Sequence, residues 1–74
     1  MRYKLVKFLN MDKAIVRNND AYYVASFADV AHSGPEVLVF PSDKNGAIAN
    51  YGEVDGGRGY KSLAEFITEK CTDL

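Results

Sequence analysis

The chain has 74 residues, with 9 Lys and Arg against 10 Asp and Glu, one His, one Cys and no Trp. A chain of this length can build only one hydrophobic core, so residues 1–74 are expected to form a single domain. The net charge of −1 argues against binding nucleic acid through overall charge, and the hydrophobic fraction of 47% argues against a disordered chain.

Three strands are expected in the first part of the chain. Residues 2–9 mix apolar and basic residues without a helical period, which is typical of a β-strand. The turn-forming residues at 10–12 separate this strand from a second one at 13–17, because Asn and Asp favour tight turns. The Asn-Asn-Asp sequence at 18–20 predicts a hairpin that leads into a third strand at 21–27.

Two further strands are expected after an irregular loop that ends at 33–35. Residues 36–40 begin with Glu36 and are then apolar on both faces, which predicts a central strand that Pro41 should end. The Asn-Gly pair at 45–46 then predicts a hairpin turn with a return strand at 47–51.

A helix is expected after the Gly-rich connection, because Ser62 and Glu65 match a capping box. Apolar residues then recur every three or four positions and form one buried stripe. The stripe consists of Leu63, Phe66, Ile67, Cys71 and Leu74. The order β-β-β-β-β-α therefore predicts an α+β fold, with a mostly antiparallel five-stranded sheet and one C-terminal helix packed on one face.

The same residues predict the environment of the protein. Cys71 has no cysteine partner within the chain, so an internal disulfide is excluded and a reducing compartment is favoured. The apolar run 37–40 is too short to cross a bilayer, and residues 1–4 lack the apolar core of a signal peptide. We expect a cytoplasmic protein without a membrane segment.

Aromatic residues indicate a possible contact surface, since one helix of about twelve residues covers only part of a five-stranded sheet. Three possibilities are open: a curled sheet that buries the rings in one core, self-association, or an interface with another protein. Aromatic and Arg side chains dominate the binding energy of interfaces. The residues expected at a partner-binding surface are Tyr22, Tyr23, Tyr51, Arg58 and Tyr60.

Catalytic and metal-binding motifs are not found. The Gly-rich segment 52–62 lacks the spacing of a phosphate-binding loop, although Arg58 and Lys61 beside a helix start can hold an anion. His32 next to Ser33 does not match a hydrolase triad, because adjacent side chains seldom face each other productively. A single His and a single Cys cannot form a closed zinc site. We therefore expect no enzymatic activity, no cofactor and no metal.

Basic residues are concentrated in residues 1–17, where Asp12 is the only acidic residue. This distribution supports an alternative function, a nucleic-acid-binding module that contacts phosphates. Its contacts would come from Lys4, Lys7, Lys13 and Arg17. A structural homodimer, joined through an uncovered sheet face or an edge strand, is a further alternative.

Residues 36–46, followed by 51–59, resemble small uncharacterised proteins of bacteriophages and prophages. The shared features are a Glu-x-x-Val-Phe hairpin, an Asn/Asp-Gly turn and an aromatic residue shortly before an acidic stretch. The resemblance implies an accessory phage protein that binds and blocks a host or defence protein, and it carries over no catalytic residue.

A second resemblance concerns the partial RNase-H-like fold of HicB-type antitoxins, in which a hairpin precedes a loop and a capped helix. The Pro-Gly-Cys element of that family is replaced here by Gly-Gly-Arg-Gly at 56–59.

The function expected from the sequence is that of a non-enzymatic binding protein. It would be an anti-CRISPR or other anti-defence inhibitor that acts by steric blockade in the host cytoplasm.

Overall fold

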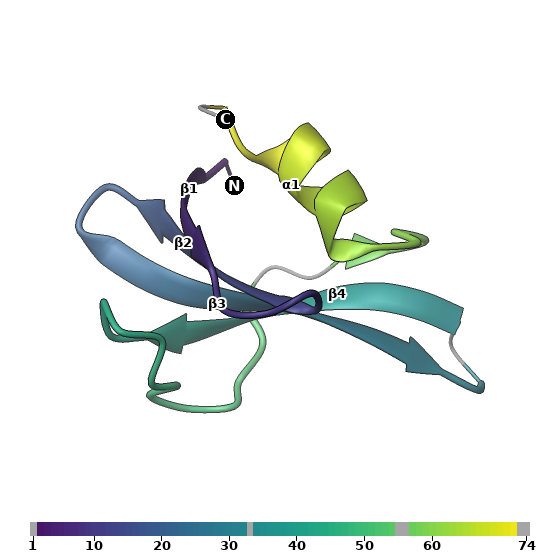
Figure 1. The fold of residues 1–74 in the computed structure, drawn as a ribbon. Helices are drawn as coiled ribbons and strands as arrows, with labels where there is room; N and C mark the ends of the chain where they lie inside the picture. Colours follow the sequence, from purple (N-terminus) through teal and green to yellow (C-terminus); the bar gives the residue numbers. More distant parts are fainter. Residues whose placement is uncertain (1, 33, 55–56, 73–74) are drawn as a thin grey trace.

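The computed structural model describes residues 2–32, 34–54 and 57–72 (Figure 1). Its elements are β1 (Lys4–Phe8), β2 (Lys13–Asn18), β3 (Ala21–Val30), β4 (Gly34–Ser42), β5 (Gly57–Arg58) and α1 (Leu63–Lys70). The strands form one antiparallel sheet in the order β1-β2-β3-β4-β5. Helix α1 lies over one face of the sheet, and the segment after β4 lies under the other (Figure 1). The predicted α+β class, antiparallel sheet and C-terminal helix are therefore confirmed.

An Asn residue stabilises each of the first two turns, one through its backbone conformation and the other through a side-chain hydrogen bond. Strands β2 and β3 are joined through residues 19–20, and Asn19 adopts a φ of 54°, a left-handed conformation that Asn tolerates better than most residues. Between β1 and β2, Asn10 Oδ1 accepts the N–H of Asp12 at 2.8 Å. Both turns lie where the sequence predicts them.

The prediction of a fifth strand at 47–51 is wrong. In this stretch Ile48 forms only an isolated bridge to Ser42. Asn50 Oδ1 accepts the N–H of Gly52 at 2.7 Å, and this local turn competes with the pairing that a strand requires. The described sheet has four strands of five to ten residues, β1 to β4, and the two-residue strand β5 at Gly57–Arg58 completes the edge beside β4.

Strands β3 and β4 extend further than the sequence predicts. Gly34 and Pro35 were expected in a loop but belong to β4, where they pair with Val30 and Asp29. Pro41, expected to end the strand, lies within β4. The long β3–β4 pair forms the centre of the sheet.

Helix α1 begins as predicted, with Ser62 as its N-cap and Ser62 Oγ accepting the N–H of Glu65 at 3.1 Å. The helix has eight residues and is shorter than the expected twelve, because the chain leaves it at Cys71 to pair with Tyr3. Leu74, the last residue of the expected stripe, lies outside the described residues. No helix in the described part of the chain has the length and apolar content needed to cross a membrane.

The two ends of the chain are held together at Tyr3. Its N–H donates to the carbonyl oxygen of Lys70 at 3.0 Å, and its own carbonyl oxygen accepts the N–H of Thr72 at 2.9 Å. Figure 1 accordingly places both termini side by side. The amino-terminal strand and the C-terminal helix thus stabilise each other.

A single core lies between α1 and the face of the sheet beneath it, which we call the helix face. Tyr3 packs against Tyr23 and Phe66 with ring centroids 5.7 and 6.3 Å apart, and Tyr60 packs against Phe66 at 5.4 Å. Edge-to-face and tilted ring pairs of this kind add to the stability that burial provides. The buried core residues are Tyr3, Ala14, Val16, Ala25, Val37, Val39, Tyr60, Leu63, Phe66, Ile67 and Cys71.

The opposite face, which we call the loop face, is partly covered by the segment after β4. Ile15 and Val24 are buried there, and the ring of Tyr51 packs on Phe40 at 5.6 Å. The Asp43–Gly46 turn forms as predicted, with the N–H of Gly46 donating to the Asp43 carbonyl oxygen at 3.1 Å and Gly46 at a φ of 90°.

Gly46 is expected to be required for this cover. A methyl group at residue 46 would lie 3.1 Å from Leu9 Cδ1 and 3.2 Å from Ile15 Cδ1. The backbone of Gly46 also has a left-handed φ. Gly59 has a similar φ of 87° but nothing within 4 Å, so Gly59→Ala is a matched control. Both variants should lose about 1 kcal/mol of unfolding free energy through backbone strain. Gly46→Ala should lose about 1 kcal/mol more through crowding, measured by urea denaturation. Equal losses would contradict the packing of this turn on the sheet.

Candidate functional site

The five residues predicted at a contact surface do not form one surface. Tyr22 and Tyr23 are neighbours in β3, so their side chains lie on opposite faces of the sheet. Tyr23 is on the helix face, in contact with Tyr3, whereas Tyr22 pairs with Arg17 on the loop face. Both are half-buried.

The remaining three residues also lie apart. Tyr51 is 76% exposed and rests on Phe40, whereas Tyr60 is only 9% exposed and belongs to the core. The backbone of Arg58 pairs with Glu36 in the sheet, and its side chain lies outside the described part of the chain. Among these residues, Tyr51 and Tyr22 offer surface to a partner, and they belong to different parts of the loop face.

Several large apolar side chains in the first predicted strand and in the turn after it are exposed. Val6 is 42% exposed, Phe8 50% and Leu9 41%, and Met11 reaches 92%. Met11 stands between Asn10 and Asp12 in the β1–β2 turn. A methionine flanked by two turn-forming residues is a signal that could have indicated an exposed apolar group, since turns lie at the surface.

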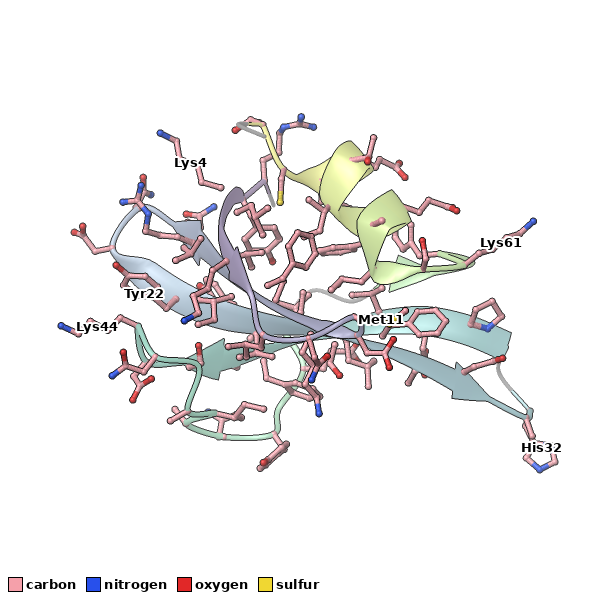
Figure 2. The ribbon with its side chains drawn as sticks, in the orientation of Figure 1. Lys4, Met11, Tyr22, His32, Lys44 and Lys61 are labelled. Atoms are coloured by element: carbon pink, nitrogen blue, oxygen red, sulfur yellow. The ribbon has the colours of Figure 1, made fainter. Side chains whose placement is uncertain are left out.

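Two of these side chains, Phe8 and Met11, border a groove of about 560 Å³ between the β1–β2 turn and the start of α1. We call it the apolar groove. It is lined by Phe8, Asn10, Met11, Asp12, Phe27, Lys61, Ser62, Leu63 and Ala64. Figure 2 shows Met11 near the first turn of the helix and Lys61 extending outward at its start. Apolar groups therefore form the floor of the groove, and polar groups form its rim.

The wall of the groove is held by backbone hydrogen bonds. The N–H of Phe27 donates to the Asp12 carbonyl oxygen at 2.8 Å, and the N–H of Leu9 donates to the Lys13 carbonyl oxygen at 2.8 Å. Together with the Asn10 side-chain bond, these contacts join the β1–β2 turn to β3. The exposed apolar side chains thus stand on a fixed backbone.

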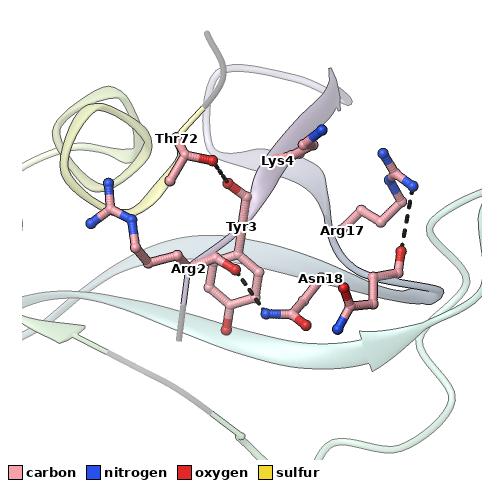
Figure 3. A pocket seen from close by; sticks show the side chains of 7 residues that line it. Arg2, Tyr3, Lys4, Arg17, Asn18 and Thr72 are labelled. Atoms are coloured by element: carbon pink, nitrogen blue, oxygen red, sulfur yellow. Dashed lines mark hydrogen bonds between the residues drawn. The ribbon is translucent and has the colours of Figure 1, made fainter.

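A second hollow, of about 300 Å³, lies at the other end of the β1–β2 hairpin (Figure 3). We call it the basic pocket. It is lined by Arg2, Tyr3, Lys4, Arg17, Asn18, Asn19 and Thr72. Three of these seven side chains are cationic and none is acidic. Figure 3 shows the guanidinium groups of Arg2 and Arg17 on either side of Tyr3, with Lys4 behind.

Hydrogen bonds also hold the basic pocket in shape. Asn18 Nδ2 donates to the carbonyl oxygen of Arg2 at 2.8 Å, which joins the start of the chain to the end of β2. Arg17 Nη1 makes a long contact of 3.4 Å to the Asn19 carbonyl oxygen. The pocket therefore depends on the same joining of chain ends that Tyr3 provides.

His32, Asp29 and Asp43 are exposed in the two hairpins that β4 connects, and Asp43 has a structural role. His32 and Asp29 are exposed near the tip of the β3–β4 hairpin, and Ser33 lies outside the described residues. Hydrogen bonds from the N–H groups of Ala47 and Asn45 hold the pKa of Asp43 below its usual range, so this carboxylate caps the turn. Within the described ranges, no three His, Cys, Asp or Glu side chains lie close enough together to hold a metal ion.

The chain was compared with known families, curated proteins and solved structures, and none of them matches it.

Cys71 is 4% exposed, in agreement with its predicted place on the buried stripe. Burial raises the pKa of its thiol, and the charge of Arg2 lowers it by a smaller amount. Because the folded-state pKa lies above the ordinary value of 9.0, the protonated thiol stabilises the fold fully below that pH. This contribution is lost as pH rises through the higher folded-state pKa.

The free energy of unfolding should therefore fall more steeply for the wild type than for Cys71→Ala as the pH rises above 9.0. Urea denaturation at each pH measures the difference. Parallel pH profiles, together with rapid alkylation of the native thiol by iodoacetamide, would show that Cys71 is accessible and would contradict its placement.

Proposed function

We propose that this chain is a non-enzymatic binding protein that takes an apolar side chain of a partner protein into the apolar groove. The observation that carries the proposal is the exposure of Phe8 and Met11 beside a groove of about 560 Å³. Grouped exposed apolar side chains rimmed by polar residues are typical of protein interaction sites. Methionine is also enriched in interfaces, because its flexible side chain fills irregular gaps.

The energetic argument rests on burial and on rigidity. Full burial of a Phe or Met side chain contributes about 1.5–3 kcal/mol, so a partner that covers Phe8 and Met11 gains a substantial part of a micromolar affinity. The hydrogen bonds of Asn10 and Asp12 keep the turn ordered before binding. A preordered surface loses less conformational entropy when it binds.

The rim of the groove favours a partner with a polar border around an apolar anchor. Lys61 and Asp12 carry opposite charges on the rim, and Ser62 and Asn10 add hydrogen-bonding groups. Such groups contribute to specificity and to the rate of association more than to affinity. The partner class that fits is a protein with one protruding Leu, Phe or Met side chain.

The resemblance to phage accessory proteins extends the proposal to the identity of the partner. A host or defence protein, bound and blocked sterically as by an anti-CRISPR or other anti-defence inhibitor, is the partner we propose. A blocking protein requires a stable surface and no catalytic group, and the apolar groove meets that requirement.

Two variants test the groove. Met11→Ser changes a side chain that is 92% exposed and should leave the fold intact, and Phe8→Ser removes the neighbouring wall. Tyr51→Ser is the control, since Tyr51 is 76% exposed but lies outside the groove. Each tagged protein is used to capture partners from nuclease-treated bacterial lysate, and the retained protein is then purified.

Wild type and Tyr51→Ser should bind the purified partner with equal affinity by calorimetry. Met11→Ser and Phe8→Ser should each weaken binding by about 10- to 30-fold, the loss typical of central interface residues. Thermal melting of each variant distinguishes loss of contact from loss of fold. If both groove variants bind the partner as tightly as the wild type, the proposal is contradicted. If the molecular mass of the protein rises with its concentration, a homodimer is favoured instead.

A further inference from the structure

The register of β1 and β2 gathers four cations on one face of the sheet. Lys4 pairs directly with Arg17, and Lys7 pairs with Ile15 after a bulge in β1. Cross-strand partners share a face, and alternate residues of one strand share a face, so Lys13, Ile15 and Arg17 lie together. Because Ala14 and Val16 belong to the core under α1, the other set lies on the loop face. The four cations on the loop face are Lys4, Lys7, Lys13 and Arg17.

This arrangement has a cost in the isolated protein. Like charges placed directly opposite each other in neighbouring strands repel, as Lys4 and Arg17 do here. The basic pocket beside them adds Arg2, and none of its described lining residues is acidic. An anion bound between Lys4 and Arg17 would offset the repulsion and would accept hydrogen bonds from the Arg17 guanidinium group.

An aromatic side chain lies next to the cations. Tyr22 pairs with Arg17 across β2 and β3, so it shares the loop face, and it is only half-buried. Figure 2 shows Tyr22 at the end of the sheet near Lys44. A basic surface with an adjacent aromatic ring is the arrangement that single-stranded nucleic acid uses, with phosphates on the cations and a base stacked on the ring.

We propose that the loop face of β1 and β2 binds the backbone of single-stranded nucleic acid, with one phosphate held in the basic pocket. Ile15 is covered by the Gly46 turn, so the open path for a strand follows the exposed edge strand β1. From Lys4 to Lys7 this strand rises about 10 Å at about 3.4 Å per residue, which accommodates two neighbouring phosphates. Tyr22 holds a base at the end of this run. The ligand is thus a strand and not an isolated phosphate. The site is separate from the apolar groove, whose lining shares no residue with the basic pocket.

The test measures binding of a fluorescein-labelled oligothymidylate by fluorescence anisotropy at several salt concentrations. About three phosphate contacts predict a slope of about −2 for log K against log salt, because single strands give about −0.7 per contact. Lys4→Gln and Arg17→Gln should each reduce the slope by about 0.7. Tyr22→Leu should weaken binding by about 5- to 150-fold without changing the slope.

Lys61→Gln is the matched control, since Lys61 is an exposed cation that lines the other hollow. It should leave both affinity and slope unchanged. Lys4→Gln should keep or raise the melting temperature, because it removes a like-charge pair, so its loss of binding cannot be attributed to unfolding. If Arg17→Gln fails to fold, Lys7→Gln replaces it, because Lys7 is exposed. The slope of log K against log salt should change by the same amount.

Three results would overturn the inference. The first is absence of oligonucleotide binding at low salt. The second is binding that Lys4→Gln, Lys7→Gln and Tyr22→Leu leave unchanged. The third is pyrophosphate binding as tightly as the oligonucleotide, which would make the pocket a site for small phosphates.

Discussion

A helix of eight residues has to be held against a sheet of five strands, and the contacts of Tyr3 hold it there. An isolated helix of this length is marginal in water, so its stability must come from packing. The ring of Tyr3 packs against Phe66 of the helix and Tyr23 of the sheet. Its backbone N–H and carbonyl groups bond to Lys70 and Thr72, the residues before and after Cys71. One residue thus joins the two ends of the chain through both its side chain and its backbone.

The small size of the helix also decides which surfaces stay open. The helix covers the helix face over the middle of the sheet, and the turn at Gly46 with the ring of Tyr51 covers the opposite face over β2, β3 and β4. Strand β1 lies at the edge of the sheet, and four of its five residues are exposed. Both hollows therefore occur along the β1–β2 hairpin. The candidate sites result from the limited cover that a chain of 74 residues can provide.

Local signals in the sequence predicted most of the fold. The Asn-rich turns at 10–12 and 18–20 and the cap at Ser62 depend on neighbouring residues only, and all three form as expected. The strand at 47–51 failed because hairpin chemistry specifies the turn but not the pairing of the residues after it. Asn50 and Asp43 accept hydrogen bonds from nearby backbone N–H groups. The segment therefore keeps only separate backbone bonds to β4, from Ala49 to Pro41 and from Val54 to Val39.

The candidate sites were harder to predict, because they depend on which sheet face the helix covers. Tyr22 and Tyr23 are equivalent in the sequence, and only the contact of Tyr23 with Tyr3 separates core from surface. The same holds for Tyr60, whose burial depends on Phe66. The cations of β1 and β2 were identified from the sequence, but their common face follows from the register and the bulge after Leu5. Composition carries no information about such a bulge.

The basic pocket and the apolar groove lie at opposite ends of one hairpin, and this spacing has a physical consequence. From Lys4 to Phe8 the strand rises about 14 Å, which is longer than the Debye length of about 8–10 Å at physiological salt. The net charge of −1 provides no long-range attraction toward a polyanion, so the cations act only on a strand that is already near. A partner protein held in the apolar groove would bring its own bound nucleic acid within that range. The second contact then becomes intramolecular, and a modest affinity at each site gives a much higher one for the pair. Under both proposals, a protein that carries a single strand across its surface would bind this hairpin more tightly than either component alone.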